Sequence, residues 1–144
     1  MTACRLNFTP VKYSAKWRKI TDRRYALSIN SGLGALNDVY MRVNFAGDTG
    51  MAFIDGEMVD DHFYSARPWE IGLKRFLPQL LENKKEMIFV FHPMTAESTS
   101  LQDLPADIQL HFAEGQKNYL AVDGVKFIPE YEAILDLSKP ETDR

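Results

Sequence analysis

The chain of 144 residues is long enough to bury a sizeable core as one domain, without disulfides or a metal. Its 45% apolar and 26% charged residues exclude a disordered or fibrous protein. The formal net charge of -3 gives no general attraction to nucleic acid or to an anionic membrane, so we expect neither as a partner.

Cys4 is the only cysteine, which excludes an intrachain disulfide and a cysteine-based metal site. The first residues lack the apolar run of a signal peptide, and no stretch approaches the roughly 20 apolar residues of a membrane span. We therefore expect a soluble chain. A leader could still precede it if it is a piece of a longer secreted protein, so its compartment stays open.

The first part of the chain predicts short strands around one basic segment. Residues 5–13 alternate in polarity around a proline, which suggests an edge strand. Residues 16–24 hold the only basic concentration, and Trp17 and Tyr25 beside it make a nucleic-acid surface one interpretation. The acidic balance of the rest favours the other interpretation, a solvated loop. That loop leads into an alternating strand over 25–30.

Residues 38–76 are the segment around which the fold is predicted to form. Residues 39–45 alternate cleanly between apolar and polar side chains, as a half-buried strand does. Residues 51–59 give two short strands joined by Asp55-Gly56, a pair typical of a type I′ hairpin. After a turn, residues 69–73 predict another alternating strand.

The remaining half predicts further strands and one helical turn. Residues 77–83 are too short and too close to a proline for a major helix. Residues 87–92 are apolar on both faces, which predicts a central strand buried on both sides. Residues 108–112 and 131–135 alternate as strands do, and Asp123-Gly124 predicts a second hairpin.

These roughly nine to eleven short strands at regular spacing predict an all-β fold. The expected architecture is a jelly-roll β-sandwich of two antiparallel sheets, with at most short helical turns. No composition shift or linker divides the chain, so residues 1–144 are expected to form a single domain.

A set of motifs in residues 36–91 suggests a family. They are Asp55-Gly56, Phe63-Tyr64, Arg67-Pro68, Trp69 to Leu73, Leu77-Pro78 and Phe89-Val90-Phe91. In these motifs the chain resembles the galactose-binding-like jelly-roll domains attached to bacterial β-galactosidase-type glycoside hydrolases. The resemblance covers the middle third to half of the chain and says little about its two ends.

The resemblance implies an accessory module rather than an enzyme. In such glycosidases the catalytic acid pair belongs to a separate TIM barrel, which is longer than this whole chain. The chain would then be one module of a larger protein, with the catalytic domain of that protein as a partner. Members of the family either bind carbohydrate or support the catalytic domain. The alternative is a protein-interaction or assembly module that binds no sugar.

An acidic group in the middle of the chain allows three interpretations. Its members are Asp55, Glu57, Asp60, Asp61 and Glu70. A glycosidase pair needs one carboxyl group with a raised pKa, and a water-exposed hairpin tip works against that. Several carboxylates could also hold a structural calcium ion, whereas aspartates at turns commonly bond their own backbone. We favour the turn interpretation and expect no catalytic residue, no metal site and no cofactor.

The candidate carbohydrate-binding residues are Asp60, Asp61, Tyr64, Arg67 and Trp69. Sugars stack their apolar faces on exposed rings, while charged and amide groups meet their hydroxyls. The competing interpretation is that the rings are core and that Arg67 forms an ion pair with Asp60 or Asp61. The exposure of Tyr64 and Trp69 decides between the two.

Overall fold

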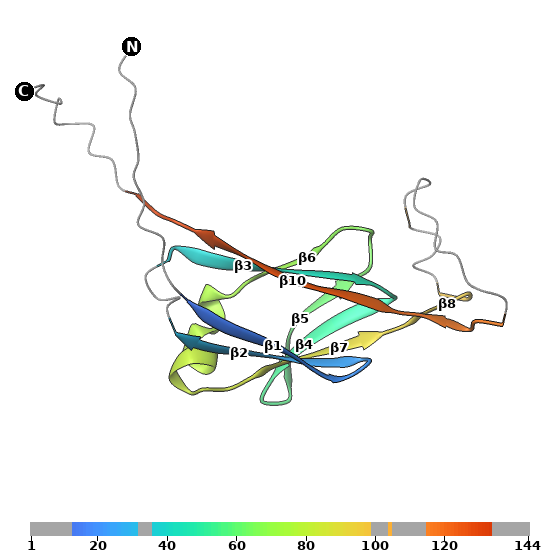
Figure 1. Cartoon of the computed structure of the whole chain (residues 1–144), viewed down its shortest axis with the longest axis horizontal. Helices are drawn as coiled ribbons and strands as arrows, with labels where there is room; N and C mark the ends of the chain where they lie inside the picture. The colour runs from blue at the N-terminus through green and yellow to red at the C-terminus, as the bar shows by residue number, and fades with distance from the viewer. Residues whose placement is uncertain (1–12, 32–35, 99–103, 105–114, 134–144) are drawn as a thin grey trace, which may run out of the picture.

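The computed structural model describes residues 13–31, 36–98, 104 and 115–133. Within these ranges the chain forms ten strands and two short helical turns, and the two larger sheets are layered on each other (Figure 1). The predicted all-β sandwich of antiparallel sheets with few helical residues is confirmed. The strand predicted over 108–112 lies outside the described residues, as does all but Tyr13 of the strand predicted over 5–13.

The larger sheet has five strands, all antiparallel to their neighbours. Its order is β1 (Ser14–Thr21), β2 (Arg24–Ser31), β7 (Met87–His92), β4 (Thr49–Ile54) and β5 (Glu57–Phe63). β7 is therefore the middle strand, with β1 and β5 at the two edges.

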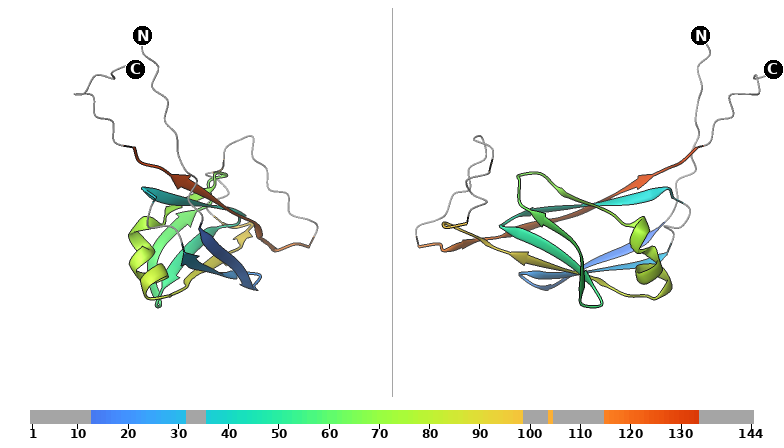
Figure 2. Two further views of the ribbon diagram at one scale, coloured as in Figure 1. Left: turned by 60° about the vertical axis from the view of Figure 1, so that its left-hand side comes forward. Right: turned by 180° about the vertical axis from the view of Figure 1, so that it is seen from behind.

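The smaller sheet has three antiparallel strands, β10 (Ala121–Glu130), β3 (Asp38–Ala46) and β6 (Trp69–Gly72). A separate short pair joins β8 (Met94–Thr95) to β9 (Asn118–Tyr119). Between β6 and β7 lie a 3-10 turn, η1 (Lys74–Phe76), and a wider helical turn, η2 (Pro78–Glu82). The two turns close one end of the sandwich (Figure 2).

An aromatic cluster fills the space between the sheets. Trp69 of the smaller sheet lies 5.5 Å from Phe89 of the larger one, and Phe45 lies 5.0 Å from Phe91, between ring centroids. Gly50 makes room for this cluster, because a Cβ there would lie 2.7 Å from Cζ3 of Trp69. The core packing thus depends on a glycine at position 50 as well as on large aromatic side chains.

The two Asp-Gly pairs behave differently. Asp55 and Gly56 both have positive φ, 52° and 77°, as the predicted type I′ hairpin requires. The hairpin predicted at Asp123-Gly124 is wrong, because β10 runs straight through it and stays paired with β3. There only Gly124 has a positive φ, 123°, and a register shift after Val122 marks a β-bulge.

Three other local predictions are corrected. The basic segment is a β-hairpin rather than a loop: β1 runs to Thr21, residues 22–23 form the turn and Arg24 begins β2. Half-buried Ala15 and Trp17 alternate with charged residues in β1. Of the strand predicted over 131–135, residues 131–133 belong to no sheet, since β10 ends at Glu130, and residues 134–135 lie outside the described residues. β7 is fully buried only on its inner side, whereas outward-facing Ile88 and Val90 are half-buried.

Candidate binding surface

The predicted site residues do not form one site, and Trp69 is the clearest correction. Its side chain is only 2% exposed. The ring stacks on His62 at 6.0 Å and 9° and meets Phe45 and Phe89 edge-on. Trp69 shares the inward face of β6 with other apolar residues, so it offers no ring surface to a sugar.

The two neighbouring aspartates point to opposite sides of β5, as successive strand residues do. Asp60 lies opposite Ala52, a core residue, and its carboxylate is 3.5 Å from the Arg75 guanidinium. Asp61 lies opposite Met51 on the outward side and is exposed. The ion pair expected of Asp60 is thus made with Arg75 rather than with Arg67.

Tyr64 and Arg67 do come together, in a shallow hollow of about 140 Å³. The hollow is lined by Asn44, Phe45, Ala46, Tyr64, Ala66, Arg67, Pro68 and Asp123. Tyr64 is half-buried against Phe45, at 5.8 Å between ring centroids, and burial raises the pKa of its hydroxyl. The hollow therefore offers one partly covered ring with an amide, a guanidinium and a carboxylate.

His62 lies half-buried at the edge of the core. Its ring lies between Trp69 and Phe45, and burial lowers the pKa of the imidazole. Within the described part of the chain, its Nε2 is buried without a hydrogen-bond partner. His62 is thus a packing residue whose protonation would be costly.

No metal centre is visible in residues 13–31, 36–98 and 115–133, where no three His, Cys, Asp or Glu side chains come together suitably. Among those same residues, no helix has the length and apolar character needed to cross a bilayer.

The most unusual surface is the outward side of the five-stranded sheet, which we call the outer face. Its apolar side chains come from the middle strand β7, from β4 and from the edge strand β5, and they are Ile88, Val90, Met51, Phe53, Met58 and Phe63. Two of these are among the most exposed large apolar side chains of the described residues, Met58 at 51% and Phe63 at 68%. Ile88, Phe53 and Met58 thus adjoin in one row across β7, β4 and β5. Val90 adjoins Met51 in the next row, and Phe63 lies beside Thr49.

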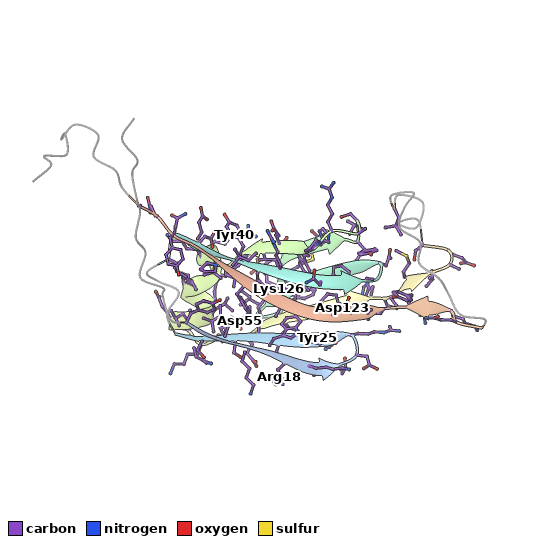
Figure 3. All side chains as sticks on the ribbon, turned by 45° about the horizontal axis from the view of Figure 1, so that its top comes forward. Arg18, Tyr25, Tyr40, Asp55, Asp123 and Lys126 are labelled. Carbon is purple, nitrogen blue, oxygen red and sulfur yellow. The ribbon has the colours of Figure 1, made fainter. Side chains whose placement is uncertain are left out.

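Charges of opposite sign border the outer face. Arg18 and Arg24 lie outward on β1 and β2, and Asp61 lies outward on β5 at the other edge. Arg18 bonds Glu86 at 3.1 Å, and together with a 2.9 Å bond from Ser28 it lowers the pKa of the Glu86 carboxyl. Figure 3 shows Arg18 pointing away from the sandwich.

The outer face was not predicted from the sequence, although one signal for it was present. Residues 87–92 are apolar on both faces, and we interpreted this as burial on both sides. Among the residues that the structure describes, another sheet packs on the inner side alone, so the same pattern marks an apolar surface. Asn44 and Asp123 were missed because strand residues far apart in sequence show no shared pattern.

The comparisons with known proteins add no relative. The chain matches no protein-family model, no curated protein sequence and no solved structure at a significant level.

Proposed function

We propose that this β-sandwich is a non-catalytic accessory module of a carbohydrate-active protein of the β-galactosidase type, and that it acts by docking on another protein surface. The sequence motifs within residues 36–91 support the first half of the proposal. One observation carries the second half, namely the apolar outer face of the five-stranded sheet, on which no other sheet of the described residues packs.

The physical reason is the cost of keeping such a face in water. Apolar surface is favourably removed from water, and contiguous apolar patches on soluble proteins commonly mark interaction sites. Methionine and phenylalanine are enriched in the cores of protein interfaces, and the flexible thioether of Met58 can adapt to a partner. An open sheet face also suits a protein partner better than a small ligand, which needs a concave site.

A second candidate function, carbohydrate binding, is favoured by the hollow at Tyr64 and Arg67. Its amide, guanidinium and carboxylate are the groups that meet sugar hydroxyls. It ranks second because the buried Trp69 removes the expected stacking surface and the hollow is shallow.

Methionine footprinting with hydrogen peroxide tests the docking function. The reference is a Val90→Glu variant, which places a charge in the middle of the outer face. In the protein in its native assembly, we expect Met58 to oxidise several-fold more slowly than in this variant. Met41 and Met87, both 0% exposed, should stay slow in both and so report that each protein is folded. Equal oxidation of Met58 in the two proteins would overturn the proposal.

Calorimetric titration with galactose and galactosides at millimolar concentration separates the two functions. The docking function predicts no binding heat. Heat that disappears in Arg67→Ala and persists in Val90→Glu would instead assign the function to the hollow.

A further inference from the structure

The charges bordering the outer face are arranged by strand. One row across the sheet reads Thr21, Arg24, Val90, Met51 and Asp61, from β1 to β5. Within the described ranges, neither the Arg24 guanidinium nor the Asp61 carboxylate has an ion-pair partner. The face therefore presents a free cation on one side of an apolar middle and a free anion on the other.

We propose that the outer face binds a second copy of this chain, around a two-fold axis that runs along β7. The inference rests on the docking function proposed above and names its partner. A two-fold axis parallel to the middle strand places β1 over β5 of the partner subunit and β2 over β4 of the partner subunit. Ile88 and Val90 of β7 then meet their own symmetry mates, as an isologous interface requires, and Phe53 lies over Ala26 of the partner subunit.

This axis also brings opposite charges together. Arg24 lies over Met51 of the partner subunit, one strand away from Asp61 of the partner subunit. Strands in a sheet are about 4.8 Å apart, a sideways step that an arginine side chain can span. By symmetry the contact occurs twice, so each copy contributes one Arg24 and one Asp61 to the two ion pairs.

The other two-fold arrangement of two stacked sheets is disfavoured by the same charges. An axis perpendicular to the strands would place β2 over β2 of the partner subunit, with Arg24 near its own symmetry mate. Like charges across an interface are costly and exclude wrong arrangements. The charge pattern thus selects the axis as well as the partner.

The area of the face agrees with a modest, reversible dimer. Five strands at about 4.8 Å and some six residues at about 3.4 Å cover about 500 Å² on each copy. Two such faces bury about 1,000 Å² in total, near the lower limit for a specific interface. We therefore expect dissociation in the micromolar range or weaker, with a dimer that forms at high protein concentration.

A charge-swap experiment by analytical ultracentrifugation tests this arrangement. The wild-type chain should form a reversible dimer. Arg24→Glu and Asp61→Lys should each weaken dimerisation by about tenfold, because both equivalent contacts become repulsive. An equimolar mixture of the two variants should restore dimerisation, because the carboxylate introduced at position 24 of one copy then meets the ammonium group introduced at position 61 of the other. Arg42→Glu, on the outward side of the three-stranded sheet, should leave dimerisation unchanged. Circular dichroism should show that every variant is folded.

Each remaining result overturns at least one of these proposals. A wild-type chain that stays monomeric at millimolar concentration excludes the second copy. If Met58 is nevertheless protected from peroxide in the native assembly, the docking function stands with a different protein partner. If Met58 is never protected, both proposals fail. A mixture of the two variants that does not recover dimerisation overturns the axis along β7.

Discussion

The outward sides of the two sheets consist of similar antiparallel strands but carry different side chains. The outward side of the three-stranded sheet carries Arg42 paired with Glu70 and Tyr40 hydrogen-bonded to Glu130. The outward side of the five-stranded sheet carries Met51, Phe53, Ile88 and Val90 in its middle instead. Tyr40 and Arg18 mark these two opposite faces in Figure 3.

The difference separates the residues that stabilise the fold from the residues that we assign to an interaction. An antiparallel sheet commonly has one face in the core and one in water, as the three-stranded sheet does here. The five-stranded sheet packs its inner face in the core, whereas Met58 and Phe63 on its outward side stay largely exposed and bury little surface in the isolated chain. We infer that the apolar residues of the outer face serve an interaction, whereas the core residues between the sheets stabilise the fold.

The largest expected effect lies in the core that both sheets share. Trp69→Ala should lower the free energy of unfolding by about 3–5 kcal/mol, because it removes a fully packed ring and leaves a cavity. Urea denaturation measures the loss, with Tyr40→Ala on the polar outer face as the matched aromatic control. A loss below about 1 kcal/mol would show that Trp69 is not the central core residue.

A smaller effect is expected from the glycine beneath that ring. Gly50→Ala should lower the free energy of unfolding by about 1–3 kcal/mol, because the added methyl group would overlap the Trp69 ring. Thr49→Ala, on the outward side of the same strand, is the control and should change stability little. Equal losses in the two variants would contradict the tight inner packing of β4.

The third prediction concerns acid sensitivity at the rim of the core. Burial lowers the pKa of His62 below its ordinary 6.5, so between the two pKa values the unfolded chain binds more protons than the folded one. The free energy of unfolding should therefore fall as pH decreases through 6.5 toward the folded pKa. His62→Phe keeps a ring on Trp69 but cannot titrate, and thermal melts should show no such fall in this variant. An identical pH dependence in both proteins would refute the assignment.

The smallest effect on stability is expected on the outer face itself. Phe63→Ser and Met58→Gln should each change the free energy of unfolding by less than about 0.5 kcal/mol, as exposed substitutions generally do. Thermal melts at low protein concentration check this. A loss above about 2 kcal/mol would mean that the outer face supports the fold, and the division between the faces would not hold.

Much of the fold could be predicted from periodicity. The alternation in residues 39–45 and the Asp55-Gly56 turn specify their strands and hairpin locally. Asp123-Gly124 carries the same two residue types, yet its backbone is decided by continued pairing with β3. A sequence motif cannot show whether a neighbouring strand continues past it, so this prediction was wrong.

The candidate site was less predictable. Trp69 alternates in phase with Ile71 and Leu73, so the sequence already placed it on the apolar side of its strand, against the predicted sugar contact. The outer face depends on sheet order, since Met51, Val90 and Asp61 become neighbours only through pairing of β4, β5 and β7. Single-sequence patterns do not give that order.

Hydroxyl-radical footprinting of both outer faces in one sample tests most directly whether only the five-stranded sheet is covered. The protein in its native assembly is compared with the Val90→Glu variant at matched radical dose. We predict that Met58 and Phe63 react several-fold less in the native assembly, while Tyr40 on the polar face reacts equally in both. Equal reactivity of Met58, Phe63 and Tyr40 in the two proteins would contradict a covered outer face.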